Sequence, residues 1–165
     1  PVVVGTTGWY AHLPVVSAHV RERDGALLWA PNFSIGVNLF QELVARAAAL
    51  MRGAASFDVH LVETHHAAKK DAPSGTAGSL ARAASHGLGR EVPITSVRTG
   101  HVPGTHELVF DAPFESIRLE HVARDRRVFA EGALAAARWL AGRRGVFTMR
   151  DLLAAPESTP NGTHS

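Results

Sequence analysis

A short run of titratable side chains carries most of the chemistry in this sequence. Glu63, His65, His66, Lys69 and Asp71 lie within one stretch, and Pro-Ser-Gly-Thr follows at 73–76. Imidazole groups exchange protons near neutral pH, and ammonium groups attract anions. The stretch therefore predicts a site that binds an acidic small molecule and supplies a proton to it.

The neighbouring residues indicate which elements position this stretch. Apolar and polar side chains alternate over 57–62, which predicts a strand. Ser74 or Thr76 is a suitable N-cap for an alanine-rich helix, whose start is marked by Pro73. We expect the polar cluster on the loop between them. A helix start offers free backbone N–H groups, and Gly75 lets an anion approach them closely.

Three stretches carry a family resemblance. The pattern Glu63-x-His65-His66-x-x-Lys69-x-Asp71-Ala-Pro-Ser-Gly-Thr-Ala closely resembles the signature of the dihydrodipicolinate reductases of lysine synthesis. Residues 4–8, Val-Gly-Thr-Thr-Gly, resemble the nicotinamide-side loop of that family, and residues 30–36, Ala-Pro-Asn-Phe-Ser-Ile-Gly, resemble its hinge motif. The resemblance runs from Pro1 to about Leu153.

The resemblance implies roles for individual residues. The family passes a hydride from NADH or NADPH to a ring carbon conjugated with an imine and adds a proton next to it. By position, His65 is the proton donor and Lys69 a second acid/base or electrostatic group, while Asp71 orients Lys69 and Glu63 is a structural partner of the loop. The substrate, a dicarboxylate, would be held by His66, Gly75 and Thr76. The nicotinamide side would be lined by Gly5, Thr6, Thr7, Ala30, Pro31, Asn32 and Phe33.

The implied fold is α/β, or α+β, with two parts. Residues 1–34 and 124–153 would be the C-terminal remnant of a Rossmann-like dinucleotide-binding domain. Residues 35–123 would form an α+β substrate-binding and tetramerisation domain with a mixed sheet of about four strands, and 154–165 a disordered tail. The resemblance also implies a cytoplasmic homotetramer.

Patterning along the chain agrees with this division. It predicts strands at 1–4, 26–30, 57–62, 94–99, 105–110 and 116–122, and helices at 10–23, 35–52, 76–85 and 126–141. Residues 147–153 are interpreted as a closing helical turn or a strand. Ser34 is the expected N-cap of the second helix.

Two departures from the family pattern leave an alternative open. No G-x-G-x-x-G joins a strand to a helix, so the first part of the nucleotide domain is expected to be lost upstream of Pro1. The connection at 87–96 is shorter than in typical members. The alternative is a non-catalytic fragment that keeps a dicarboxylate-binding and oligomerisation domain. A second rival is a metal-dependent hydrolase using His60, His65 and His66, although His60 and His65 would point to opposite faces of a strand.

Composition argues against several classes of partner and chemistry. The net charge is only +2 and no Lys/Arg block exceeds two residues, which argues against nucleic acid. No apolar run approaches the length of a membrane span, and the absence of cysteine excludes disulfides and thiolate chemistry.

Overall fold

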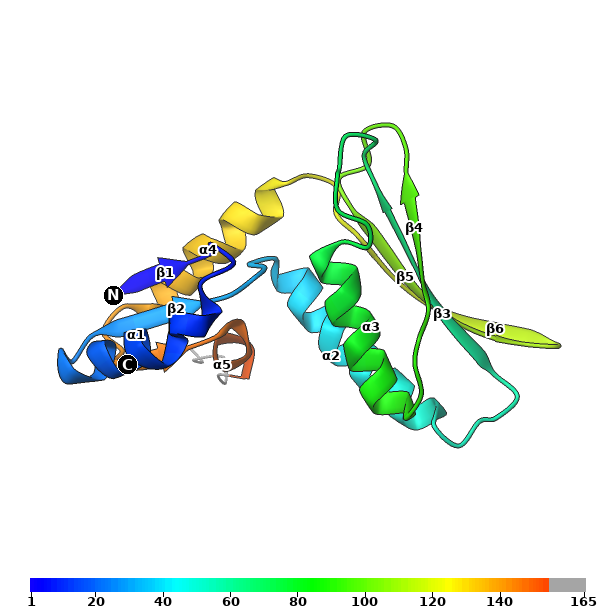
Figure 1. Ribbon diagram of the computed structural model, residues 1–165, viewed down its shortest axis with the longest axis horizontal. Coiled ribbons are helices and arrows are strands. Elements are labelled where there is room, and N and C mark those ends of the chain that lie inside the picture. The colour runs from blue at the N-terminus through cyan, green and yellow to red at the C-terminus, as the bar shows by residue number, and fades with distance from the viewer. Residues whose placement is uncertain (155–165) are drawn as a thin grey trace, which may run out of the picture. The chain divides into compact units, whose positions relative to one another are not determined.

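The computed structural model describes residues 1–154 and divides the chain into two compact units (Figure 1). The first unit contains residues 1–31 and the segment from Ala133 onward, and the second contains Asn32–Gly132. The predicted disordered tail at 154–165 lies outside the described residues, apart from Ala154. The domain limits expected from the sequence, at 34 and 124, stay a prediction.

The first unit is built on a parallel sheet of three short strands in the order β1-β2-β7. These strands are β1 (Val2–Val4), β2 (Ala26–Trp29) and β7 (Gly145–Phe147). A 3₁₀ turn (Tyr10–His12) and α1 (Leu13–Glu22) connect the first two, and α5 (Met149–Ala154) follows the third. The central strand β2 is the most buried of the three, as expected where both neighbours of a parallel strand are present.

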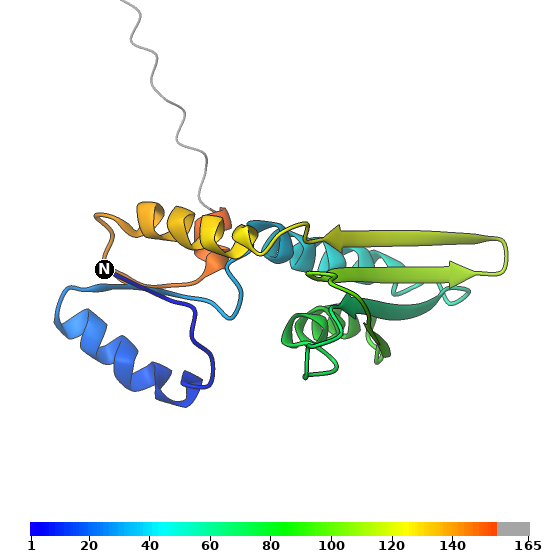
Figure 2. The ribbon, with the colours of Figure 1, turned by 90° about the horizontal axis from the view of Figure 1, so that it is seen from above.

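The second unit contains a mixed sheet in the order β4-β3-β5-β6. The strands are β3 (Asp58–His65), β4 (Ile94–Arg98), β5 (Thr105–Ala112) and β6 (Glu115–Val122). Only the β3–β4 pair is parallel; the pairs β3–β5 and β5–β6 are antiparallel. The predicted α/β class with a mixed four-stranded sheet is confirmed. Figure 2 shows β5 and β6 as a long hairpin.

Two helices cover one face of this sheet. They are α2 (Ile35–Met51) and α3 (Gly75–Leu88), which lie side by side in Figure 1. The core between helices and sheet includes Val44 from α2, Leu80 from α3, Leu61 from β3 and Phe110 from β5, all fully buried. Ser34 caps α2 by accepting from the Val37 N–H, as predicted. The fourth helix, α4 (Arg127–Leu140), leads the chain from the second unit into the first.

Several elements extend further than the sequence predicts. Helix α3 runs three residues beyond the predicted Ser85, to Leu88, and strand β7 at Gly145–Phe147 was missed apart from its last residue. Strand β3 was expected to end at Val62, yet it continues to His65.

No helix among residues 1–154 is long and apolar enough to cross a membrane.

Candidate active site

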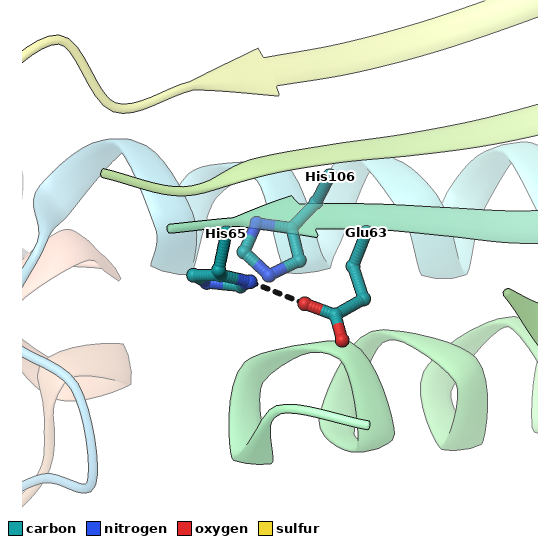
Figure 3. A group of neighbouring side chains, drawn as sticks. All are labelled: Glu63, His65 and His106. Atoms are coloured by element: carbon teal, nitrogen blue, oxygen red, sulfur yellow. Dashed lines mark hydrogen bonds and ion pairs between the residues drawn. The ribbon is translucent and has the colours of Figure 1, made fainter. Parts of the chain in front are cut away.

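The site begins where β3 places acidic and imidazole groups on its inner face. The alternation along β3 buries Val59, Leu61, Glu63 and His65 and leaves the intervening side chains partly exposed. Figure 3 shows Glu63 and His65 pointing to the same side of the strand, with His106 beside them. The prediction that the polar cluster lies wholly on a loop was therefore wrong for Glu63–His65. Polar side chains can continue the buried face here because each finds a hydrogen-bond partner.

Glu63 is the centre of the arrangement and has no exposed surface. Its Oε1 accepts from Arg98 Nη2 at 2.7 Å and from the Ser74 backbone N–H at 3.3 Å, while Oε2 pairs with His65 Nδ1. Burial alone would raise the pKa of this carboxyl. The hydrogen bonds from Arg98, Ser96 and Ser74, with the charge of His65, outweigh burial and lower that pKa to about 2. Glu63 is therefore ionised at neutral pH.

His65 is buried, with 8% of its surface exposed. Burial lowers the pKa of its imidazole, the Glu63 carboxylate raises it, and the positive charges of Lys69 and Arg98 lower it again. The net direction is downward, which favours the neutral ring in the free protein. An anion bound nearby would oppose that shift and favour the protonated ring.

His106 comes from β5 and packs edge-on against His65, with ring centroids 5.2 Å apart. Its Nε2 lies 3.4 Å from Ser74 Oγ, and that hydroxyl also accepts from the Ala77 N–H to cap α3. Burial, with the charge of His65, lowers the pKa of His106 to about 4. His106 was not among the predicted site residues, although only 4% of its surface is exposed. Its position on the inner face of an alternating strand was the signal that could have found it.

The loop after β3 adds positive charge. Lys69 Nζ lies 2.6 Å from Asp71 Oδ1, and Arg98 Nη2 donates to the Asp71 carbonyl at 2.6 Å. The hydrogen bond from the Lys69 ammonium lowers the pKa of the Asp71 carboxyl. The geometry agrees with the expectation that Asp71 orients Lys69. Arg98 was not among the predicted site residues.

The start of α3 lies against this cluster. Ser74, not Thr76, is the N-cap, which leaves Gly75 exposed and Thr76 half-buried in the first turn. Thr76 Oγ1 accepts from Asn32 Nδ2 at 3.2 Å. His66 follows the end of β3 and is half-buried. The structure thus gathers the predicted substrate-side residues His65, His66, Lys69, Gly75 and Thr76 around one strand end and one helix start.

The predicted cofactor-side residues divide between the units. Gly5, Thr6 and Thr7 are exposed after β1, and Ala30 and Pro31 follow β2, all in the first unit. Asn32 and Phe33 belong to the second unit. Gly5, Thr6, Thr7 and Pro31 are exposed, whereas Ala30 and Phe33 are buried.

A metal ion is a less suitable occupant of the buried cluster. Donor atoms of Glu63, His65 and His106 lie within 4.8 Å of one another. However, Arg98 and Ser74 occupy one carboxylate oxygen of Glu63 and His65 occupies the other. A cation there would lie close to a guanidinium group. The alternative trio His60, His65 and His66 does not converge, because His60 and His65 lie on opposite faces of β3.

The fold and site together define an α/β protein with a buried carboxylate–imidazole pair at a helix start. A family model described as "Dihydrodipicolinate reductase, C-terminus" matches residues 36–153. The chain belongs to the dihydrodipicolinate reductase family.

Similarity to individual proteins supports the same family membership. The chain is 37% identical over 166 residues to a 4-hydroxy-tetrahydrodipicolinate reductase of Christiangramia forsetii, covering 93% of this chain and 70% of the relative. It is 49% identical over 158 residues to one of Stenotrophomonas maltophilia strain R551-3, covering 92% and 62%. A dipicolinate-bound dihydrodipicolinate reductase from Paenisporosarcina sp. TG-14 has the same fold, with a TM-score of 0.74, 25% identity and coverage of 88% and 62%. The chain spans 62–70% of the length of these three relatives.

Proposed function

We propose that this protein takes part in the NADH- or NADPH-dependent reduction catalysed by 4-hydroxy-tetrahydrodipicolinate reductase. The observation that carries the proposal is the convergence of His65, Arg98 and the Ser74 N-cap of α3 on the buried carboxylate of Glu63. Arg98 also donates to the Asp71 carbonyl, and the Asp71 carboxylate pairs with Lys69. Family membership and the dicarboxylate named for the solved relative support the same assignment.

In this proposal each residue has a defined task. The free N–H groups at Gly75 and Thr76 bind one substrate carboxylate, with the helix dipole favouring the negative charge. His66 contacts the substrate. Lys69 attracts the dianion and stabilises charge that develops on the ring nitrogen. His65 gives a proton to the ring after the bound anion has favoured its charged form.

The cofactor belongs to the proposal as well. Bound nicotinamide would supply a hydride. From the family resemblance, we propose that its ring side is held by Gly5, Thr6, Thr7, Ala30, Pro31, Asn32 and Phe33. No G-x-G-x-x-G stands between β1 and α1, so we expect this chain to bind the pyrophosphate weakly or not at all.

We also propose that the protein assembles as a homotetramer in the cytoplasm. The sheet face away from α2 and α3 supports assembly, because Val97 and Val122 on that face are 38% and 50% exposed. Light scattering after size-exclusion chromatography tests this: a mass four times 17.6 kDa agrees with it, and a monomer at micromolar concentration contradicts it.

The function is tested by NADPH oxidation with freshly generated substrate, comparing the wild-type chain with His65→Gln. Loss of a general acid lowers turnover by about 10²–10⁴-fold and changes substrate affinity far less. Equal turnover by both proteins would remove His65 from the chemistry. A second candidate function is a dicarboxylate-binding domain without catalysis. It is favoured if neither protein oxidises NADPH while the wild type binds pyridine-2,6-dicarboxylate with the same affinity in the presence and absence of NADPH. The observation that favours this second candidate is that the chain covers only 62% of the length of two of its relatives.

A further inference from the structure

Glu63 can impose a protonation pattern on its neighbour because its carboxylate is fixed on both sides. Oε1 is held by Arg98 Nη2 and the Ser74 N–H, from β4 and from the start of α3. Oε2 therefore has one fixed direction, toward His65 Nδ1. The side chain has no exposed surface, so water does not compete for either oxygen. Such a carboxylate is a rigid acceptor and offers no proton of its own.

The pairing determines which nitrogen of His65 carries the proton in the neutral ring. An ionised carboxylate only accepts, so Nδ1 must be the N–H donor. The other nitrogen, Nε2, points away from Glu63 (Figure 3). A Cβ at Gly104 would lie 3.1 Å from Nε2, and Gly104 has a φ of 154°, so the ring is also packed against backbone that carries no side chain.

The other groups around His65 do not provide an alternative acceptor for Nδ1. His106 contacts the ring edge-on from β5, and its Nε2 lies near Ser74 Oγ. Lys69 and Arg98 are positively charged, and both disfavour a proton on His65. Among residues 1–154, Glu63 is thus the main carboxylate acting on this imidazole.

We propose that Glu63 is a positioning residue that holds His65 as the Nδ1–H tautomer, so that every proton His65 exchanges with a ligand is carried on Nε2. In this scheme Nε2 takes a proton from solvent when an anion binds and then gives it to the ligand. The Nδ1–H bond to Glu63 is kept throughout, and the carboxylate offsets the charge of the transient imidazolium. The role of Nε2 as donor rests on the proposed function; the tautomer does not.

The test is nitrogen NMR on the full chain labelled with ¹⁵N-histidine. Two-bond and three-bond correlations distinguish a protonated ring nitrogen from one with a lone pair, and the His65→Gln spectrum assigns the signals. We expect a protonated Nδ1 and an unprotonated Nε2 at neutral pH. A protonated Nε2 with a bare Nδ1, or a rapidly exchanging mixture, would overturn the proposal without any variant of Glu63.

Glu63→Gln then asks whether the carboxylate is the cause. The amide oxygen of the introduced glutamine can replace Oε1 toward Arg98 and Ser74, which turns its NH₂ group toward Nδ1. We expect His65 to switch to the Nε2–H tautomer and its pKa to fall below that of the wild type. Glu107→Gln is the matched control, since Glu107 pairs with Arg118 on the opposite face of the sheet, and it should leave His65 unchanged. A folded Glu63→Gln protein that retained Nδ1–H would contradict the proposal.

The same samples separate this proposal from the proposed function. Titration with pyridine-2,6-dicarboxylate should raise the pKa of His65 in the wild type, with the added proton on Nε2. A wild-type protein with the Nδ1–H tautomer but no dicarboxylate binding would contradict the proposed function while confirming the positioning by Glu63. Binding with the added proton on Nδ1 would contradict the positioning instead.

Discussion

Asn32 donates from Nδ2 to the hydroxyl oxygen of Thr76 across 3.2 Å, and so links the start of the second unit to the first turn of α3. The amide orientation follows from its other bond, because Oδ1 accepts from the Ser34 N–H at 2.8 Å. The backbone carbonyl of Asn32 accepts from Asn38 in turn. A residue proposed for the cofactor side is thereby fixed to one proposed for the substrate side.

This link predicts coupling between the two side chains. Asn32→Ala and Thr76→Val each break the same hydrogen bond, so the double variant should lose less unfolding free energy than the sum of the single ones. The expected discrepancy is about 1 kcal/mol, the usual net value of one neutral hydrogen bond. Urea unfolding of the four proteins measures it. Losses that add to within about 0.3 kcal/mol would show that the bond contributes nothing in solution.

Helix α3 offers a matched pair of glycines for testing its packing on α2. A Cβ at Gly87 would lie 2.7 Å from the Ala45 carbonyl oxygen, whereas one at Gly78 would meet only the flexible end of Arg82 at 3.4 Å. Gly87→Ala should therefore destabilise the protein by about 1–3 kcal/mol through overpacking. Gly78→Ala should stabilise it by up to about 1 kcal/mol through helix propensity. Equal effects of the two changes in urea unfolding would contradict the close contact between α2 and α3.

The buried imidazole of His106 predicts that stability depends on pH. Its pKa falls from 6.5 to about 4 on folding, because burial, with the charge of His65, disfavours the charged ring. Between these values the unfolded chain binds more protons than the folded one. The contribution of the neutral His106 ring to the free energy of unfolding is therefore fully present above pH 6.5 and is lost as the pH falls through about 4. The total loss is about 3 kcal/mol.

Urea unfolding between pH 7.5 and 4 checks this prediction with two variants. His106→Gln should flatten the pH dependence, because it removes the titrating ring. His60→Gln, on the opposite face of neighbouring β3, should keep the wild-type slope. The groups that act on His106, namely His65, Glu63, His121 and Lys69, remain in both proteins. An unchanged slope in His106→Gln would assign the acid sensitivity to another group.

The sequence predicted the elements better than the inner arrangement of the site. Local patterns were sufficient for α2, with its Ser34 cap, and for the four strands of the mixed sheet, because periodicity and capping act over a few residues. Strand β3 was cut short at Val62 because Glu63 and His65 do not resemble core residues. Their burial depends on Arg98 from β4 and on Ser74.

Partners distant in sequence were the part that pattern reasoning missed. Arg98 is 35 positions from Glu63, and His106 is 32 positions from Ser74, so their pairings depend on strand register. The parallel pairing sets His65 opposite Arg98, and the antiparallel pairing sets Glu63 opposite His106. No local signal reports these registers. Strand β7 was missed for a related reason, since Gly-Val-Phe becomes a strand only by pairing with β2.

The most direct measurement is calorimetric titration of pyridine-2,6-dicarboxylate into residues 1–165, with Lys69→Ala and Lys70→Ala as a matched pair. Lys69 is half-buried and pairs with Asp71, whereas Lys70 is exposed beside it. We expect the wild type to bind the dicarboxylate. Lys69→Ala should lose about 10-fold or more in affinity, because a hydrogen bond to a charged group contributes about 1.5–3 kcal/mol. Lys70→Ala should change the affinity little. Absence of binding to the wild type, or equal losses in the two variants, would contradict a dicarboxylate site at the start of α3.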